Sequence, residues 1–444
     1  MSDSSFIFEG FFSQKLSSHF FSLSQKKEIK IHCFGKNNFG QLGIESIELK
    51  QNNPQAFNFF ESDEISILIL GGEHCLVLIS SRKERKVFGW GRNDYGQIGI
   101  GNNSHQNLPK EILFFQGKSV KLIACGFHFS LCLTFERGFP KKNLIFFSSL
   151  LFKIEVFSWG DNSYGQLGHG DQTKRNSPSK VSQLDGKEIQ EIACEGYSSF
   201  VWNQNSLFSW GNNSSGQLGL GDFEDKTTPQ ERSIQVIVLV CGESHCFCLS
   251  KDLKIWSWGL NYFGQLGLGI KESKISTPQE VLFFQNHDEI HSIACGGIHS
   301  LFWTSQGLFA CGDNYYNQLG LGEEFKEESS NLFQEVSFFK EKQILSIGTG
   351  CNHSFCLTSE GLYGWGNNYY DQLSFEEKTI PLPRKVSFLN SNSRNISIGR
   401  NEDFFIKERN LFLILCRELI SSEENNLFDQ DYLPLDLFKI FLNF

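Results

Sequence analysis

Short segments in which apolar and polar residues alternate run through most of the chain. Examples are VFSW at 156–159, IWSW at 255–258 and FCL at 247–249. Alternation over four to six residues, with aromatic and β-branched side chains, is typical of half-buried β-strands. The segments come in groups of about four, separated by turns. The pattern therefore predicts an all-β protein made of four-stranded units.

One motif returns seven times and divides the chain into these units. It reads SWGDNSYGQLG at 158–168 and SWGLNYFGQLG at 257–267, and its glutamine falls at 41, 97, 166, 217, 265, 318 and 372. Successive copies are about 50 residues apart, which is the length of one propeller blade. We predict a seven-bladed β-propeller of tandem repeats over residues 15–416, followed by a helical C-terminal tail over 417–444.

The residue types of the motif fit a compact loop between blades. Glycine tolerates positive φ, asparagine can cap a turn with its side-chain amide, and leucine anchors the loop against neighbouring blades. For the glutamine we expect hydrogen bonds to the loop backbone. A phosphate-binding loop occurs once in a domain and ends in a lysine that opens a helix. The seven copies here have neither property, so we predict a structural loop.

A glycine-rich turn followed by histidine forms a second signature. The histidines are His74, His245, His299 and His353, while Phe129, Ser198 and Glu402 stand at the same position of other copies. Five histidines, counting His19 in a partial first copy, could suggest a metal ring. Each belongs to a different blade, however, and zinc needs clustered ligands. We predict that each histidine holds the turn of its own blade, and we predict neither a metal nor a cofactor.

Composition narrows the class of partner. The net charge is −10 with histidine neutral, and no basic stripe of the kind that binds phosphates is present, which argues against direct nucleic-acid binding. No apolar run is long enough for a membrane span, and the N-terminus lacks the features of a secretory signal. We therefore expect an intracellular protein, cytoplasmic or nuclear.

The cysteines are too sparse for a disulfide scaffold. There are 13 of them, with no CxxC pair. Cys125, Cys194, Cys241 and Cys295 recur at one position of the repeat. We interpret them as small buried hydrophobic residues.

The motif WGxNxxGQLG, together with turns such as CGGIHSLFW at 295–303, resembles the regulator-of-chromosome-condensation repeat family. Members of that family are seven-bladed propellers, and the resemblance covers residues 15–416. It implies a binding platform. The founding member promotes nucleotide exchange on the small GTPase Ran on chromatin, and other members are scaffolds in ubiquitin ligases or membrane-traffic proteins, or a plant UV-B photoreceptor.

Departures from the family decide among these functions. The founding member's basic N-terminal tail is missing, and its irregular exchange loop has no counterpart to which its acidic residue could be assigned. The photoreceptor's Gly-Trp-Arg-His-Thr string is also absent. No nucleophile and base stand at catalytic spacing. We predict a non-enzymatic protein-interaction scaffold or adaptor, with guanine-nucleotide exchange on a Ran-like small GTPase as the alternative.

If a protein partner docks, polar residues of the regular loops should carry the specificity, on one rim of the ring. The candidates for partner binding are Arg92, Asp94, Asp161, His169, Asp171 and Asp222.

Three segments lie outside the regular repeat. Residues 139–154 form an apolar insert, which is either a partner-binding element, an unstructured loop or a retained non-coding stretch. The run 432–444 has a proline, Pro434, near its start and faintly resembles the opening of an F-box, although an ordinary packing helix is favoured. One terminal hairpin should close the ring by pairing across the junction. We favour the N-terminal one, because SHFFSLS at 18–24 matches SHCFCLS at 244–250.

Overall fold

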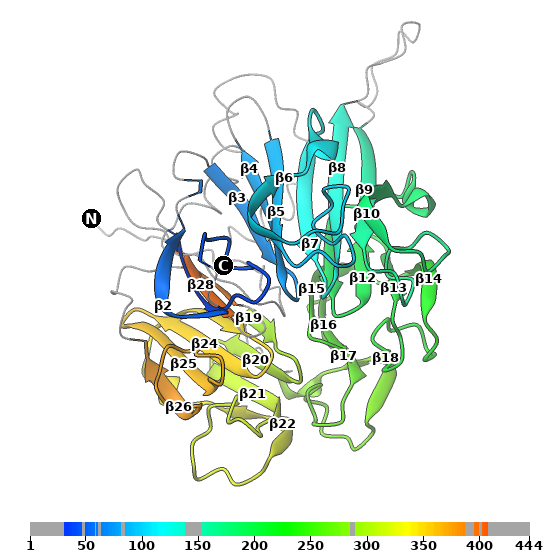
Figure 1. The fold of residues 1–444 in the computed structure, drawn as a ribbon. Helices are drawn as coiled ribbons and strands as arrows, with labels where there is room; N and C mark the ends of the chain where they lie inside the picture. The colour runs from blue at the N-terminus through cyan, green and yellow to red at the C-terminus, as the bar shows by residue number, and fades with distance from the viewer. Residues whose placement is uncertain are drawn as a thin grey trace, which may run out of the picture. The chain divides into compact units, whose positions relative to one another are not determined.

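A computed structural model describes residues 31–46, 49–57, 59–60, 64–80, 85–137, 152–284, 289–386, 395–398 and 402–406. All of them belong to the unit Met1–Lys407. They form seven antiparallel sheets of four strands each (Figure 1). The all-β propeller predicted from the repeat is confirmed. The predicted domain limits at 15 and 416, and the predicted helical tail, lie outside the described residues and stay predictions.

The first three blades are numbered from the start of the chain. Blade 1 joins β1 (Ile31–Lys36) and β2 (Lys50–Phe57) to β27 (Asn395–Ile398) and β28 (Glu402–Ile406). Blade 2 contains β3 (Glu64–Leu70), β4 (His74–Ser80), β5 (Arg85–Gly91) and β6 (Gln106–Glu111). Blade 3 contains β7 (Val120–Cys125), β8 (Phe129–Arg137), β9 (Phe152–Gly160) and β10 (Arg175–Lys180).

The other four blades are each continuous in sequence. Blade 4 contains β11 (Glu191–Glu195), β12 (Ser198–Trp202), β13 (Leu207–Gly211) and β14 (Lys226–Arg232). Blade 5 contains β15 (Val236–Cys241), β16 (His245–Ser250), β17 (Ile255–Leu260) and β18 (Lys274–Glu280). Blade 6 contains β19 (Ile290–Cys295), β20 (His299–Thr304), β21 (Gly307–Asp313) and β22 (Ser329–Glu335). Blade 7 contains β23 (Ile344–Thr349), β24 (His353–Thr358), β25 (Gly361–Asn367) and β26 (Thr379–Lys385).

The two ends of the repeat array meet in blade 1. Its strand order is β2-β1-β28-β27, and β1 pairs with β28 in antiparallel register from His32 opposite Phe405 to Gly35 opposite Glu402. The C-terminal hairpin therefore supplies the two inner strands. Our preference for the N-terminal hairpin was wrong, because the better sequence match of 18–24 did not decide which segment pairs with β1. Residues 18–24 themselves lie outside the described residues.

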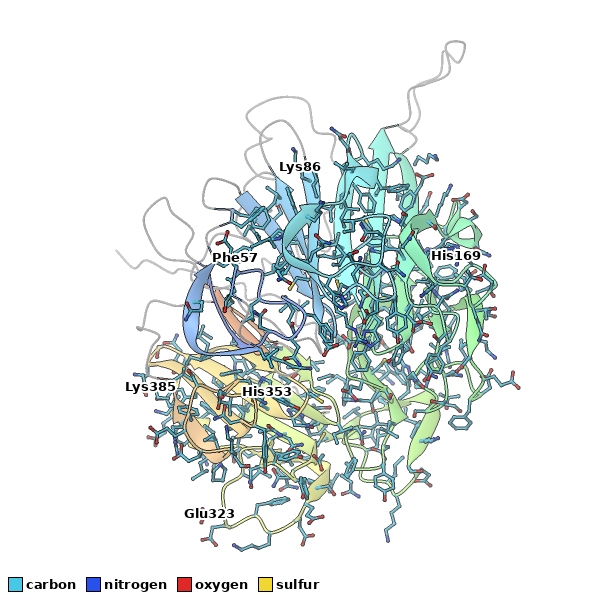
Figure 2. All side chains as sticks on the ribbon, in the orientation of Figure 1. Phe57, Lys86, His169, Glu323, His353 and Lys385 are labelled. Atoms are coloured by element: carbon cyan, nitrogen blue, oxygen red, sulfur yellow. The ribbon has the colours of Figure 1, made fainter. Side chains whose placement is uncertain are left out.

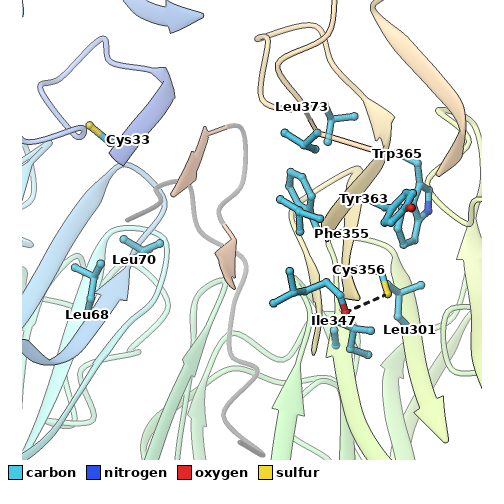
Figure 3. Close-up of a cluster of buried hydrophobic side chains, with 14 of the residues drawn as sticks. Cys33, Leu68, Leu70, Leu301, Ile347, Phe355, Cys356, Tyr363, Trp365 and Leu373 are labelled. Carbon is cyan, nitrogen blue, oxygen red and sulfur yellow. Dashed lines mark hydrogen bonds between the residues drawn. The ribbon is translucent and has the colours of Figure 1, made fainter. Parts of the chain in front are cut away.

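The hydrophobic core lies between blades. Each of four buried clusters draws its side chains from two adjacent blades, and a fifth includes residues of blades 1, 2, 6 and 7. Figure 3 shows part of the fifth, with Phe355, Trp365 and Leu373 of blade 7 among its labelled side chains. A blade thus buries its apolar faces only against its neighbours, which is why a ring of repeats is the stable form.

The loop that follows the third strand of a blade, here called the Asn–Gly loop, is held by a pattern of hydrogen bonds that recurs from blade to blade. In blade 3 the Asn162 Oδ1 atom accepts from the backbone N–H of Leu167, and the Gln166 Oε1 atom accepts from that of Tyr164. The same two bonds recur in all six other blades. The loop leucines are buried. The structural roles predicted for asparagine, glutamine and leucine are confirmed.

In blade 2 the loop position that meets the next blade requires glycine, whereas blades 6 and 7 have Asn317 and Asp371 there, also with positive φ. A Cβ on Gly96 would lie 2.4 Å from the Cα atom of Asn176, and the φ of Gly96 is +80°. Any other residue would therefore meet both a strained backbone and a clash with backbone atoms.

Four short 3₁₀ turns lie at the opposite end of the strands. They are η1 (Leu113–Phe115), η2 (Ser182–Leu184), η3 (Leu282–Phe284) and η4 (Ser337–Phe339). Each turn leads from the outer strand of one blade toward the inner strand of the next. The third residue of every turn is buried, whereas Leu113 and Leu282 are exposed. The insert 139–154 interrupts the hairpin between β8 and β9 at this same end, and only its residues 152–154 are described, within β9.

Candidate partner-binding face

The Asn–Gly loops and the glycine-rich turns lie at one end of the strands. The backbone N–H of Arg92 bonds to the carbonyl of Glu73, that of Asp161 to His128, and that of Asp313 to Ile298. In each case the residue that follows the Trp-Gly or Cys-Gly pair of the motif bonds to the turn between the first two strands. The seven loops therefore line one face of the propeller, which we call the loop face.

Aromatic side chains occupy one position of nearly every loop on this face. The residue before the motif's second glycine position is Phe39, Tyr95, Tyr164, Phe263, Tyr316 or Tyr370, and only blade 4 has a serine, Ser215. In blades 5, 6 and 7 a second aromatic residue precedes it. These residues, Tyr262, Tyr315 and Tyr369, are 72%, 65% and 55% exposed. Large exposed aromatic groups on a rigid scaffold are typical of binding surfaces.

The rings contact one another from loop to loop. Tyr95 stacks on His128 with ring centroids 5.1 Å apart, and Tyr164 contacts Tyr197 at 5.1 Å. Tyr316 lies 6.1 Å from Tyr369 of the next loop. The aromatic residues at the two loop positions thus form a partly continuous band, here called the aromatic rim. It consists of Phe39, Tyr95, Tyr164, Tyr262, Phe263, Tyr315, Tyr316, Tyr369 and Tyr370.

Arg92 is the centre of an ionic cluster on this face. Its guanidinium donates to Glu73 at 2.7 Å and to Asp94 at 2.6 Å, and lies 4.8 Å from the centre of the Phe39 ring. Lys36 donates to Glu73 as well, at 2.7 Å. Burial alone would raise the pKa of Glu73, but the hydrogen bonds from Lys36 and Arg92 outweigh it and lower the pKa. The cluster joins the loops of blades 1 and 2.

Asp161 is a loop residue that the structure buries. Its side chain is only 4% exposed, and its carboxylate accepts from the Ser163 hydroxyl at 2.7 Å and the Gln166 amide at 2.9 Å. The hydrogen-bond partners of its carboxylate therefore belong to its own loop. We had expected an exposed residue at this position.

The residue after Trp-Gly decides whether the loop glutamine is fully bonded. Asn212 and Asn367 accept from the amide of their loop glutamine, as Asp161 does. Blades 2 and 5 have Arg92 and Leu260 at this position, and the buried Nε2 atoms of Gln97 and Gln265 have no hydrogen-bond partner. Sequence reasoning missed this difference, although the seven aligned motifs contain it.

His169 and Asp171 follow the motif in blade 3, where Figure 2 labels His169. The Nε2 atom of His169 lies 2.9 Å from the Ser158 hydroxyl, and burial lowers its pKa to about 4, with the Arg175 charge contributing. Asp171 binds Arg175 through both of its carboxylate oxygens, at 3.1 and 2.8 Å. The hydrogen bond from Arg175 lowers the pKa of Asp171 to about 2. Both side chains stabilise this loop.

Asp222 has the same place in blade 4. It accepts from the Asn213 amide at 2.9 Å and forms an ion pair with Lys226 at 3.0 Å. Burial opposes the lowered pKa of Asp222, which results from its backbone and Lys226 hydrogen bonds. The six predicted residues therefore all lie in loops of the loop face, but in three separate loops of blades 2, 3 and 4. Their role in partner binding stays a prediction.

The buried histidines link neighbouring blades. His74, His245 and His299 place Nε2 within 2.9–3.0 Å of the hydroxyl of Ser130, Ser300 and Ser354 in the next blade. Each serine also donates to a loop glutamine carbonyl. The single hydroxyl hydrogen is used there, so the histidine must donate from Nε2.

Our prediction for the histidines was therefore incomplete. Each ring does pack on the glycine of its own turn, since a Cβ on Gly296 would lie 2.2 Å from the His299 Cε1 atom. The polar link, however, goes to the neighbouring blade. Burial lowers the pKa of His245 and His299 to about 3, so both are neutral at physiological pH.

Five tryptophans make a second link between blades. Trp90, Trp159, Trp210, Trp258 and Trp365 are fully buried, and each indole N–H donates to a loop glutamine carbonyl at 2.9 Å. Blade 6 has Cys311 in this place, and Phe333 packs against Gly267 where other blades put tryptophan.

The four cysteines that recur at one position of the repeat are buried, as predicted. They are Cys125, Cys194, Cys241 and Cys295.

Two features are absent from the described part of the chain. No helix there is long and apolar enough to cross a membrane. No group of three or more histidine, cysteine, aspartate or glutamate side chains there is arranged to hold a metal ion.

The repeats of this chain match models of a known repeat family. The family model of the regulator of chromosome condensation (RCC1) repeat matches residues 30–78, 86–133, 155–202, 204–249, 254–303 and 306–357. A second model of the same repeat matches 236–265. The matched residues amount to about two thirds of the chain.

Curated relatives include the ultraviolet-B receptor UVR8 of Arabidopsis thaliana, 29% identical over 70% of this chain and 67% of the receptor. The human X-linked retinitis pigmentosa GTPase regulator is 30% identical over 77% of this chain but only 31% of its own length. The human probable E3 ubiquitin-protein ligase HERC4 is 31% identical over 49% of this chain and 19% of the ligase. The chain thus spans a minor part of the ligase and the GTPase regulator.

Among solved structures, Prp20p of Saccharomyces cerevisiae has the same fold. The TM-score is 0.69 with 22% identity, covering 90% of this chain and 97% of Prp20p, a structure described together with its binding to Gsp1p and histones. Human WBSCR16 has a TM-score of 0.67 at 21% identity over 85% of this chain and 98% of its own.

Proposed function

Because this chain belongs to the regulator of chromosome condensation (RCC1) repeat family, we propose that it is a non-enzymatic protein-interaction scaffold whose partner docks on the loop face. One observation carries the proposal: the aromatic rim is exposed although its loops do not need it. The loop backbone is held by asparagine, glutamine and buried leucine. Exposed tyrosines such as Tyr262 and Tyr315 contribute little to that framework. Aromatic rings on rigid loops bind partners with little loss of conformational entropy.

Charges on the same face supply specificity in this proposal. Arg92 and Asp94 are partly exposed and lie beside the rim residue Tyr95. Asp171 and Asp222 are exposed by a similar amount in the next two loops. Asp161 and His169 act by holding the loops that present them. Rim charges of this kind govern association rate and partner choice more than total affinity.

The test compares two faces of one protein. The triple variant Tyr262→Ala, Tyr315→Ala and Tyr369→Ala removes exposed rings from the loop face. The matched control, Leu113→Ala, Leu282→Ala and Phe338→Ala, removes exposed apolar groups from the opposite end of the strands. Partners are identified by affinity capture with the unchanged protein and quantified by titration with the purified partner. The proposal requires that the first variant weakens binding at least tenfold and the control does not.

Nucleotide exchange on a Ran-like small GTPase is the second candidate function. The observation that favours it is the fold shared with Prp20p, whose binding to Gsp1p is part of that structure's description. Release of a fluorescent guanine nucleotide from a purified Ran-type GTPase measures it directly. Acceleration at catalytic amounts of this protein would establish exchange. Release at the intrinsic rate with micromolar protein would leave the scaffold function alone.

A further inference from the structure

A groove lies between the Asn–Gly loop of blade 2 and the outer strand of blade 3. It has a volume of about 320 Å³ and is lined by Tyr95, Asn103, Lys174, Arg175, Asn176, Ser177 and Ser179. None of the six loop residues predicted from the sequence lines it. It lies beside the ionic cluster of Arg92, because Tyr95 contacts that guanidinium.

Backbone contacts fix the position of Asn176, one of the lining residues. Gly96 packs directly on Asn176, and the N–H of Gly101 donates to the Asn176 carbonyl at 2.9 Å. One wall is held by the stacking of Tyr95 on His128. The groove is therefore formed before any ligand arrives, which reduces the entropic cost of binding.

The polar groups at the groove include both used and free donors. The Asn103 amide already donates to the Asp94 carbonyl, and the Ser177 and Ser179 hydroxyls donate to Asn176 Oδ1 and to the Ser177 carbonyl. Arg175 is held in place by Asp171 and by the Thr173 carbonyl. Lys174 is exposed and forms no ion pair or hydrogen bond with the described residues. Within the same described part of the chain, the Asn176 amide nitrogen and the Tyr95 hydroxyl also make no hydrogen bond.

A free ammonium, a free amide N–H and a free hydroxyl around one hollow favour an oxyanion. A carboxylate or a phosphate group accepts several hydrogen bonds at once and pairs with the lysine charge. The volume of about 320 Å³ exceeds a single oxyanion and has room for the side chain that carries it.

We propose that this groove binds an oxyanion, a phosphate or a carboxylate, on a side chain of the partner protein, with Lys174 as its counter-charge. The proposal rests on the proposed function, since the anion belongs to a docked partner. Arg175 forms the wall beside Lys174, and Asp171 positions Arg175. Tyr95 contributes its hydroxyl and links the groove to the aromatic rim.

Synthetic probes test the groove without the partner. The full-length protein is titrated by calorimetry with a capped Gly-Gly-phosphoserine-Gly-Gly peptide, with the same peptide carrying glutamate or serine, and with inorganic phosphate. We expect the phosphoserine or the glutamate peptide to bind, the tighter of the two identifying the group, and the serine peptide not to bind.

Variants then locate the binding. Lys174→Glu should weaken it at least tenfold, and Tyr95→Phe about threefold, because it removes only the hydroxyl. Lys271→Glu is the matched control, since Lys271 is another exposed lysine on a loop of the same face. Equal weakening by both lysine variants, binding of inorganic phosphate alone, or no binding by any probe would overturn the proposal. None of these results depends on whether a partner has been captured.

Discussion

Two junctions between blades are packed in the same way but are held by different polar contacts. Between blades 5 and 6, His245 bonds to Ser300, but the loop residue Leu260 leaves the Gln265 amide without a partner. Between blades 3 and 4 the arrangement is reversed. Phe129 replaces the histidine, while Asp161 accepts from the Gln166 amide at 2.9 Å.

Both junctions share one contact, the hydrogen bonds that the loop glutamine carbonyl accepts from the next blade. In both, the glutamine carbonyl accepts a hydrogen bond from a serine of the next blade, Ser199 at 2.7 Å or Ser300 at 2.8 Å. A tryptophan or cysteine of that blade donates to the same carbonyl. The histidine and the aspartate are additions to this common link. A junction can therefore lose one of them and still close.

The largest effect is expected from removing a buried histidine. His245→Ala should lower the free energy of unfolding by about 3 kcal/mol, because it opens a cavity and deletes a buried hydrogen bond. His245→Phe should cost less, because Phe129 packs against Gly126 in the equivalent place. Urea denaturation of both variants provides the measurement. If the phenylalanine variant were less stable than the alanine variant, phenylalanine could not replace histidine here as it does at the junction of blades 3 and 4.

The histidines also predict a pH dependence of stability. Their pKa is about 3 in the folded protein, whereas the ordinary value is 6.5. The unfolded chain therefore binds protons between these values that the folded protein does not. Their stabilising contribution is complete above pH 6.5 and is lost as the pH falls toward 3. The double variant His245→Phe and His299→Phe should lose stability less steeply over this range in urea titrations, and an identical slope would contradict the assignment.

A smaller effect is expected from substituting the loop residue after Trp-Gly at each junction, because this residue decides whether the glutamine amide has an acceptor. Leu260→Asn should raise the free energy of unfolding by about 1 kcal/mol, because the new carbonyl accepts from the Gln265 amide. Asp161→Leu should lower it by about 1–2 kcal/mol, because it removes that acceptor in blade 3. Thermal and urea unfolding measure both. Destabilisation by Leu260→Asn would show that the amide of Gln265 is not available to the new side chain.

The smallest effect on stability is expected at the aromatic rim. Exposed surface substitutions usually change stability by less than about 0.5 kcal/mol. The triple variant of Tyr262, Tyr315 and Tyr369 should therefore unfold like the unchanged protein. A large loss of stability would mean that the rim is part of the framework shared by the junctions and is not reserved for a partner.

The sequence was sufficient for the architecture because each blade repeats one motif. The loop roles of asparagine, glutamine and leucine followed from their residue types, and the structure confirms them. Ring closure was predicted wrongly, because pairing with β1 depends on tertiary contacts that local similarity does not contain. The histidine links to the next blade, such as His299 to Ser354, were missed for the same reason.

The candidate face was predictable only in part. The rim aromatic residues occupy two adjacent positions of the aligned motifs, so the sequence already contained them, but charged residues were chosen instead. Asp161 is buried, which depends on how the loop folds back on itself. The groove at Lys174 joins two blades, and no pattern along the chain indicates which residues meet there.

Hydrogen exchange of the protein alone and in complex with its captured partner tests the central claim most directly. Amides of the Asn–Gly loops, such as those at 92–105 and 314–328, should gain protection when the partner binds. Amides at the 3₁₀ turns, such as 113–116 and 337–340, should exchange at unchanged rates. Protection confined to the 3₁₀ turns, with the loop amides unchanged, would contradict docking on the loop face.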